Sequence, residues 1–262
     1  MKKKILSSIT ALAFVLTVVA SAAPAGAEPA DDSLPQTPGT YSVPGHSHLK
    51  LRVFVHNAKN QSGPSVNPVL SLQCNLSDPD SSTADGIIGW HLPSGNWTYH
   101  LNTGSAPSTI GGTNLSTLTG NAFGKWATTD VGKSVSFVKG SNTSANRARY
   151  DGQNIVSWGR TSGSALAVTY TWYNQSTGVV AENDTIFNSK FAWAWSSQSN
   201  CAYSGYYDAQ DILTHELGHW MGLDDNYDAS YTNNTMYGYG SPTEVKKNTL
   251  ASGDVSAVNS IY

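Results

Sequence analysis

The most informative segment of the chain is residues 215–225, which read His215-Glu216-Leu217-Gly218-His219-Trp220-Met221-Gly222-Leu223-Asp224-Asp225. Four residues along a helix bring a side chain about 40° past a full turn, so His215 and His219 lie on one face and can reach one metal ion. Zinc in catalytic sites takes three protein ligands and keeps a fourth position for water. Glu216 is placed to take a proton from that water, so the segment predicts a metallopeptidase active site.

The glycine after the second histidine offers a route to a third ligand. Gly222 stands where the helix should end, and glycine readily adopts the left-handed conformation that turns a chain back. Asp225 can then reach the metal, with Asp224 as its adjacent competitor. The pattern His-Glu-x-x-His-x-x-Gly-x-x-Asp resembles the metzincin signature, with the aspartate of snapalysin-type enzymes in place of the usual third histidine. Metzincins also carry a methionine turn beneath the metal, and Met236 is the candidate here.

The wider sequence resembles one branch of the metzincins, the matrixins, and especially their bacterial forms. The segments that carry this resemblance are residues 165–170, 182–188, 207–214, 236–237 and 250–255. The resemblance covers roughly residues 95 to 262. It implies an α/β (α+β), zincin-like fold: a twisted mixed sheet of about five strands, an active-site helix, a Met-turn and a C-terminal helix.

The resemblance also implies where a substrate would lie. In the matrixin-like fold an extended peptide pairs with the edge strand of the sheet above the zinc, a form of strand addition. By position, Leu166 and Ala167 would offer their backbone groups to that peptide. Residues 237–242, with Tyr237 and Tyr239, would form the wall of the pocket for the residue after the scissile bond.

One departure from the family concerns further metal ions. Members with a structural zinc carry histidines near the edge strand, but Val168 and Ile186 stand at the matching positions, so we expect one catalytic zinc only. Calcium near Asp151, Glu182 or Asp184 remains an open alternative to plain solvated carboxylates, because carboxylates on loops suit calcium.

Five other histidines lack ligand spacing with any partner, and we interpret them as surface or packing residues. They are His46, His48, His56, His91 and His100.

The N-terminus predicts secretion. Three lysines, an apolar run over residues 5–23 and Ala25-Gly26-Ala27 are typical of a signal peptide cut before Glu28, with an uncleaved membrane anchor as the alternative. We therefore divide the chain into a signal peptide (1–27), an N-terminal extension (28–94) and a catalytic domain (95–262). The extension is a propeptide, a small subdomain or an elaboration of the catalytic domain.

Charge and composition limit the classes of molecule that we expect this protein to bind. The formal net charge is −3, and no basic run follows Lys4, so nucleic acid and anionic membranes are not expected to bind. We expect a monomer that acts on polypeptides. A catalytically silent binding or adhesion protein on the same fold is the alternative reading, and Glu216 argues against it because a purely structural zinc site does not need that carboxylate.

The two cysteines, Cys74 and Cys201, predict one disulfide in an oxidising compartment. The alternative is that Cys74 acts as an inhibitory thiolate on zinc, as a cysteine does in many matrixin propeptides. The surrounding residues resemble that switch only faintly.

The hydrophobic pattern predicts the order strand, helix, strands, zinc helix, final helix. Strands are expected over residues 49–55, 97–101, 135–138, 155–158, 166–173 and 179–187. Helices are expected through residues 115–126, from Asp208 as the cap of the zinc helix, and through residues 255–262. Residues 28 to about 45 read as a flexible leader because of their prolines and small polar residues.

Overall fold

The computed structural model describes residues 34–59 and 69–262, all within one unit that spans residues 31–262. The predicted signal peptide, residues 1–27, lies outside the described residues. Among the described residues, no helix combines the length and the apolar character needed to cross a membrane.

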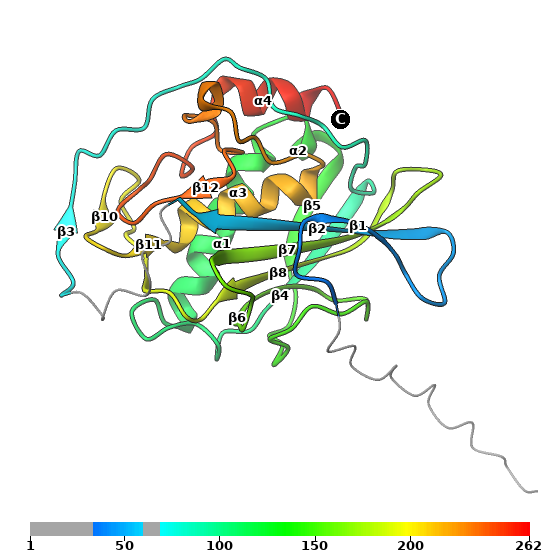
Figure 1. Ribbon diagram of the computed structural model, residues 1–262, viewed down its shortest axis with the longest axis horizontal. Helices are drawn as coiled ribbons and strands as arrows, with labels where there is room; N and C mark the ends of the chain where they lie inside the picture. The colour runs from blue at the N-terminus through cyan, green and yellow to red at the C-terminus, as the bar shows by residue number, and fades with distance from the viewer. Residues whose placement is uncertain (1–33, 60–68) are drawn as a thin grey trace, which may run out of the picture. The chain divides into compact units, whose positions relative to one another are not determined.

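The described residues form one mixed sheet of eight strands (Figure 1). Its strands follow the order β1-β2-β7-β8-β6-β4-β5, and β12 pairs with β2. These strands are β1 (Gly39–Ser42), β2 (Leu49–Ala58), β4 (Gly95–Leu101), β5 (Val135–Lys139), β6 (Asn154–Gly159), β7 (Ala165–Asn174), β8 (Val180–Asn188) and β12 (Tyr239–Gly240). Strands β4, β5, β6 and β8 pair in parallel, whereas β7 runs antiparallel to both β8 and β2. Two small sheets pair β3 (Leu72–Gln73) with β10 (Ala202–Tyr203), and β9 (Trp193–Ala194) with β11 (Tyr207–Asp208).

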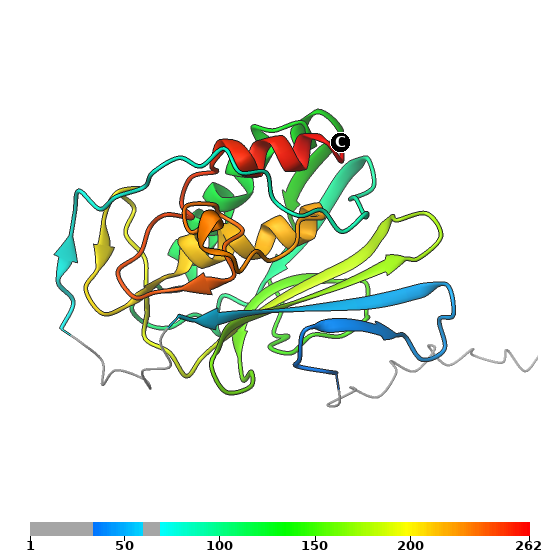
Figure 2. The ribbon, with the colours of Figure 1, turned by 45° about the horizontal axis from the view of Figure 1, so that its top comes forward.

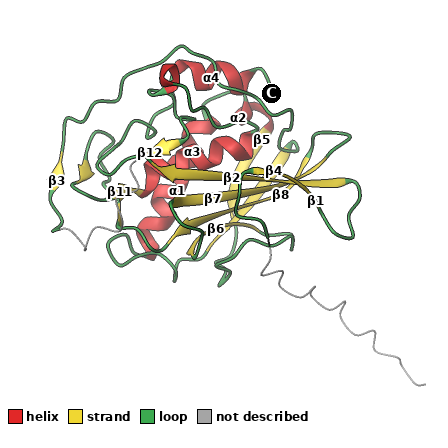
Figure 3. Ribbon diagram, viewed as in Figure 1, coloured by secondary structure: helices red, strands yellow, loops and turns green. Residues whose placement is uncertain are grey.

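The helices gather on one side of this sheet (Figure 3). They are α1 (Gly112–Ala127), α2 (Val131–Ser134), α3 (Ala209–Met221), the 3-10 helix η1 (Ala229–Tyr231) and α4 (Ser252–Asn259). The larger hydrophobic cluster joins α1, α3 and α4 to this face, and a smaller one covers the opposite face. Because side chains alternate along a strand, Phe54 of β2 belongs to the first cluster, while Val53 and Val55 belong to the second.

The predicted fold class is confirmed, since the structure has a mixed sheet, few helices and the expected order of elements. Three expectations were wrong. The sheet has eight strands rather than about five, because β1, β2 and β12 join it. Residues 39–42, expected within a flexible leader, form β1 because they pair with residues 50–53 of β2.

The strand predicted as the sheet edge also lies inside the sheet. β7 pairs with β8 on one side and with β2 on the other, from Leu49 opposite Asn174 to Asn57 opposite Ala165. The prediction missed this because no local pattern links β2 to a strand more than a hundred residues away. The far end of β2 meets β12, which pairs with Asn57 and Ala58 (Figure 2). Thus β2 runs between β7 and the segment expected to wall the pocket.

The second part of the N-terminal extension belongs to the core. Trp90 and Leu92 are buried, and the indole N–H of Trp90 donates to the carbonyl of His219 at 3.1 Å. The predicted disulfide between Cys74 and Cys201 is confirmed, so Cys74 is not free to act as a thiolate.

Candidate metal centre

Helix α3 begins and ends where the sequence predicts. The side chain of Asp208 accepts hydrogen bonds from the backbone N–H groups of Gln210 and Asp211, both at 3.0 Å. At the other end Gly222 has φ 107°, the left-handed conformation that an L side chain rarely adopts. A Cβ there would also overlap the carbonyl oxygen of Trp90. Only glycine fits this turn, which directs the following residues back toward the helix.

The turn brings three side chains together. The Oδ1 atom of Asp225 lies 3.2 Å from Nε2 of His215 and 3.6 Å from Nε2 of His219. The other ring nitrogens are held away from this point: Nδ1 of His215 lies 2.8 Å from the carbonyl oxygen of Thr235, and Nδ1 of His219 lies 2.9 Å from that of Leu223. Both rings therefore present Nε2 to the same small space.

These three atoms fit a metal ion. Bonds of 2.0–2.1 Å at a tetrahedral centre place two ligand atoms about 3.3 Å apart, close to the separations seen. All three atoms are buried and have no hydrogen-bond partner among the described residues. Buried polar atoms without partners are costly. A cation would satisfy all of them at once, and the set of two imidazoles and one carboxylate suits zinc.

Burial of the side chain distinguishes Asp225 from Asp224 as the candidate third ligand. The side chain of Asp225 is 6% exposed, whereas that of Asp224 is 39% exposed and pairs with Arg52 at 3.3 Å. Burial alone would raise the pKa of Asp225, but His219 and His215 outweigh it and hold the pKa well below its usual range. The second oxygen of Asp225 accepts a hydrogen bond from Tyr227 at 3.2 Å, a contact that sequence spacing did not indicate.

Glu216 lies beside this group and is held by a chain of hydroxyl groups. Thr169 donates to its Oε2 at 2.5 Å. The hydroxyl hydrogen of Thr169 is used in this bond, so Thr185 is the donor in the 2.7 Å hydrogen bond between Thr185 and Thr169. The indole N–H of Trp220 in turn donates to the hydroxyl of Thr185 at 3.0 Å. Burial raises the pKa of Glu216 to about 7, against the opposing effects of His219 and Thr169. Oε1 is buried and has no hydrogen-bond partner among the described residues, so it is available to a reacting water.

Met236 lies directly against the zinc helix. A Cβ at Gly218, between the two histidines, would overlap its sulfur. The two N–H groups of Thr235 and Met236 donate to the carboxylate of Asp254 at 3.1 and 3.4 Å. These two hydrogen bonds fix the position of the Thr235 carbonyl oxygen, which in turn lies 2.8 Å from Nδ1 of His215 and orients that ring. The role of Met236 as the floor of the metal site stays a prediction.

The predicted substrate residues lie near the centre, but the strand they belong to is occupied. Ala167 of β7 stands opposite His56 of β2, and Leu166 is buried in the core. Tyr239 pairs with Asn57, and its ring packs 5.7 Å from that of Tyr237. Contact of these residues with substrate stays a prediction.

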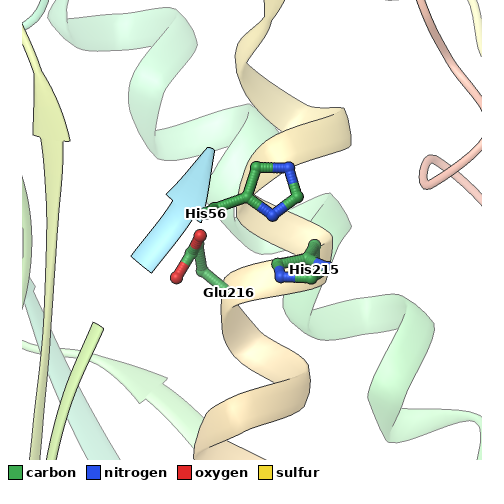
Figure 4. A group of neighbouring side chains, drawn as sticks. All are labelled: His56, His215 and Glu216. Carbon is green, nitrogen blue, oxygen red and sulfur yellow. The ribbon is translucent and has the colours of Figure 1, made fainter. Parts of the chain in front are cut away.

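His56 is the functional candidate that sequence reasoning missed. The sequence indicates only a surface or packing residue, and the structure shows it fully buried, with its ring centroid 4.0 Å from that of His215. A nitrogen of His56, one of His215 and an oxygen of Glu216 all lie within 4.8 Å of one another (Figure 4). Burial lowers the pKa of His56 well below its usual value. Only the pairing of β2 with β7 creates this proximity, so spacing could not reveal it.

The carboxylates considered for calcium have other partners. Glu182 accepts from the backbone N–H groups of Asp151 and Gly152, and Asp184 accepts from those of Arg149 and Ile155. They order the loop that precedes β6. Calcium there stays an untested prediction.

The family can now be stated from comparison as well as geometry. The sequence model described as Matrixin matches residues 90–262, which is more than half of the chain. The chain belongs to the matrixin family. Matrixins are zinc metallopeptidases, so this matrixin is a zinc metallopeptidase whose substrates are polypeptides. A search among curated proteins finds no significant match.

Proposed function

We propose that this matrixin is a secreted endopeptidase with one catalytic zinc, held by His215, His219 and Asp225, and with Glu216 as the general base. The observation that carries the proposal is the convergence of three buried ligand atoms beside a carboxylate oxygen, all four without a hydrogen-bond partner among the described residues. A purely structural zinc site has no use for that fourth group. Secretion rests on the composition of residues 1–27.

Bound zinc would supply positive charge that acidifies a water molecule and polarises the scissile carbonyl. The residues of the chain do the rest. Oε1 of Glu216 takes the proton from the attacking water and passes it to the leaving amine. Thr169 keeps the other oxygen fixed, so that Oε1 faces the site. Burial, which raises the pKa of Glu216, favours the uptake of a proton by this carboxylate.

Substrate alignment follows from the place of β2. An extended peptide that paired with Leu166 and Ala167, and that passed the wall at Tyr237 and Tyr239, would need the space that β2 holds. We therefore propose that β1 and β2 act as an inhibitory propeptide-like segment. Residues 69–94 are instead a lasting part of the catalytic unit, since Trp90 is in the core and Cys74 is bridged to Cys201.

The test compares Glu216→Gln with the parent protein and with Asp228→Asn, which changes an exposed carboxylate outside the site. Peptide-library hydrolysis is measured before and after limited proteolysis. Glu216→Gln should retain zinc while turnover falls at least about 100-fold, because general-base catalysis is lost. Asp228→Asn should match the parent. Unchanged turnover in Glu216→Gln would refute its role as base. Bound zinc without turnover after β2 is removed would instead favour the silent binding protein.

A further inference from the structure

His56 carries two buried polar atoms that its packing leaves without hydrogen-bond partners among the described residues. These atoms are its two ring nitrogens, and the whole side chain is fully buried. A buried imidazole left in this state is costly. Figure 4 shows the ring reaching from β2 over the zinc helix, with one nitrogen facing His215 and Glu216. The unpartnered nitrogens therefore point to a ligand.

The ligand would be the ion already assigned to the metal centre. His215 belongs to two groups of closely spaced ligand atoms, one with His219 and Asp225 and one with His56 and Glu216. Its Nδ1 is engaged by the carbonyl of Thr235 at 2.8 Å, so Nε2 is the nitrogen left for either group. One nitrogen binds one ion. The two groups therefore share Nε2 of His215, and His56 approaches it from the side of Glu216. Among the described residues no group joins His56 to His219 or Asp225, so binding of the same ion needs the His56 ring to close on them.

Several contacts fix His56 above this point. β2 is hydrogen-bonded to β7 on one side and to β12 on the other. Two residues before His56, the ring of Phe54 stacks on that of His219 at 3.8 Å and 7°. Further along, Arg52 pairs with Asp224 in the loop that carries the third ligand. The imidazole is thus held by the same strand and loop that frame the metal site.

We propose that His56 is a fourth protein ligand of the zinc while β2 is paired with β7 and β12. The proposal rests on the zinc site of the proposed function. The neutral imidazole donates a nitrogen lone pair at the position that water would hold, and that water leaves. Four protein ligands make a closed, four-coordinate site, which is the structural rather than the catalytic form. Glu216 then has no water to deprotonate. Departure of β2 removes the imidazole and reopens the position.

The test counts imidazole ligands rather than turnover. The full-length protein is loaded with Zn²⁺ for X-ray absorption and with Co²⁺ for visible spectra. The variants are His56→Ala, His56→Phe, which fills the buried volume without a ligand atom, and His48→Ala, which removes an exposed histidine just before β2. The parent and His48→Ala should show three imidazoles. Both His56 variants should show two. Azide, as a probe of an open position, should bind the His56 variants at least about 10-fold more tightly, because the parent site is largely closed.

Each outcome decides something definite. Two imidazoles in the parent, or equal azide affinity in the parent and the His56 variants, would overturn the proposal while leaving the catalytic zinc intact. Failure of the parent to bind either metal would instead refute the metal centre on which the proposed function rests. If the His56 variants do not fold, the imidazole count of the parent alone decides between three ligands and two.

Discussion

Replacing Gly222 with alanine tests whether the turn after the zinc helix builds the metal site. Two costs arise at this position. The residue has φ 107°, and a left-handed conformation costs an L residue about 1–2 kcal/mol. The new Cβ would also overlap the carbonyl oxygen of Trp90 and approach Ile261 at 3.2 Å, and overpacking of this kind costs about 1–3 kcal/mol. Gly222→Ala should therefore lower the free energy of unfolding by about 2–5 kcal/mol.

Gly95→Ala is the matched control. Gly95 has φ 104°, almost the same angle, but a Cβ there would meet nothing within 4 Å. It should show the conformational cost alone. Denaturant unfolding in a chelator measures both variants without the contribution of metal. Zinc affinity, measured by competition with a coloured chelator, should fall in Gly222→Ala and not in Gly95→Ala, because only the first displaces Asp225. Equal stability and equal zinc affinity in the two variants would refute the reasoning.

Two further changes test the ligand assignment and the helix cap. Asp225→Ala should weaken zinc binding at least about 10-fold, since loss of even an outer partner of a metal costs that much. Asp224→Ala changes an exposed side chain and should retain zinc. The zinc content of both variants is measured after dialysis against a weak chelator. Full zinc occupancy in Asp225→Ala would show that the third ligand has been misassigned. Burial raises the pKa of Asp208 to about 7, against the hydrogen bonds from Asp211, Ser196 and Gln210. The folded state then holds more protons than the unfolded state between about pH 4 and 7, so this group contributes a fall in stability as pH rises, at most about 1.4 kcal/mol per unit. Asp208→Asn keeps an acceptor oxygen but cannot ionise, and should flatten the stability-pH curve of the metal-free protein; an unchanged slope would contradict the assignment.

The residues that sequence alone located are those whose geometry is local. The spacing of His215 and His219 follows from the helical repeat, and the return of Asp225 follows from one left-handed glycine. Asp208 as cap and Gly222 as terminator are likewise decided within a few residues of the helix ends. Such features depend on local backbone geometry, which the residue types and their spacing in a single sequence are enough to predict.

The residues that sequence could not locate depend on pairing between distant strands. Thr169 reaches Glu216 only because β7 crosses the zinc helix, and His56 reaches His215 only through the register of β2 on β7. A shift of that register by one residue would turn His56 to the opposite face of the sheet. The alternation of apolar and polar residues along β2 predicts neither its pairing with β7 nor the register of that pairing. The same alternation would suit an edge strand or an interior strand equally.

The disulfide determines what a single cut in the chain would separate. Cys74 and Cys201 close residues 74–201 into one covalent loop, and β2 lies outside it, joined by one stretch of chain. If β2 is the inhibitory segment proposed above, then while that stretch is intact β2 competes with substrate for its place beside β7 at the effective concentration of a tethered segment, on the order of millimolar. After a cut between β2 and Cys74 it competes only as a free peptide. At micromolar protein the concentration of β2 available for binding falls by about 1000-fold. The free energy that favours the bound segment then falls by about 4 kcal/mol, although every contact is unchanged.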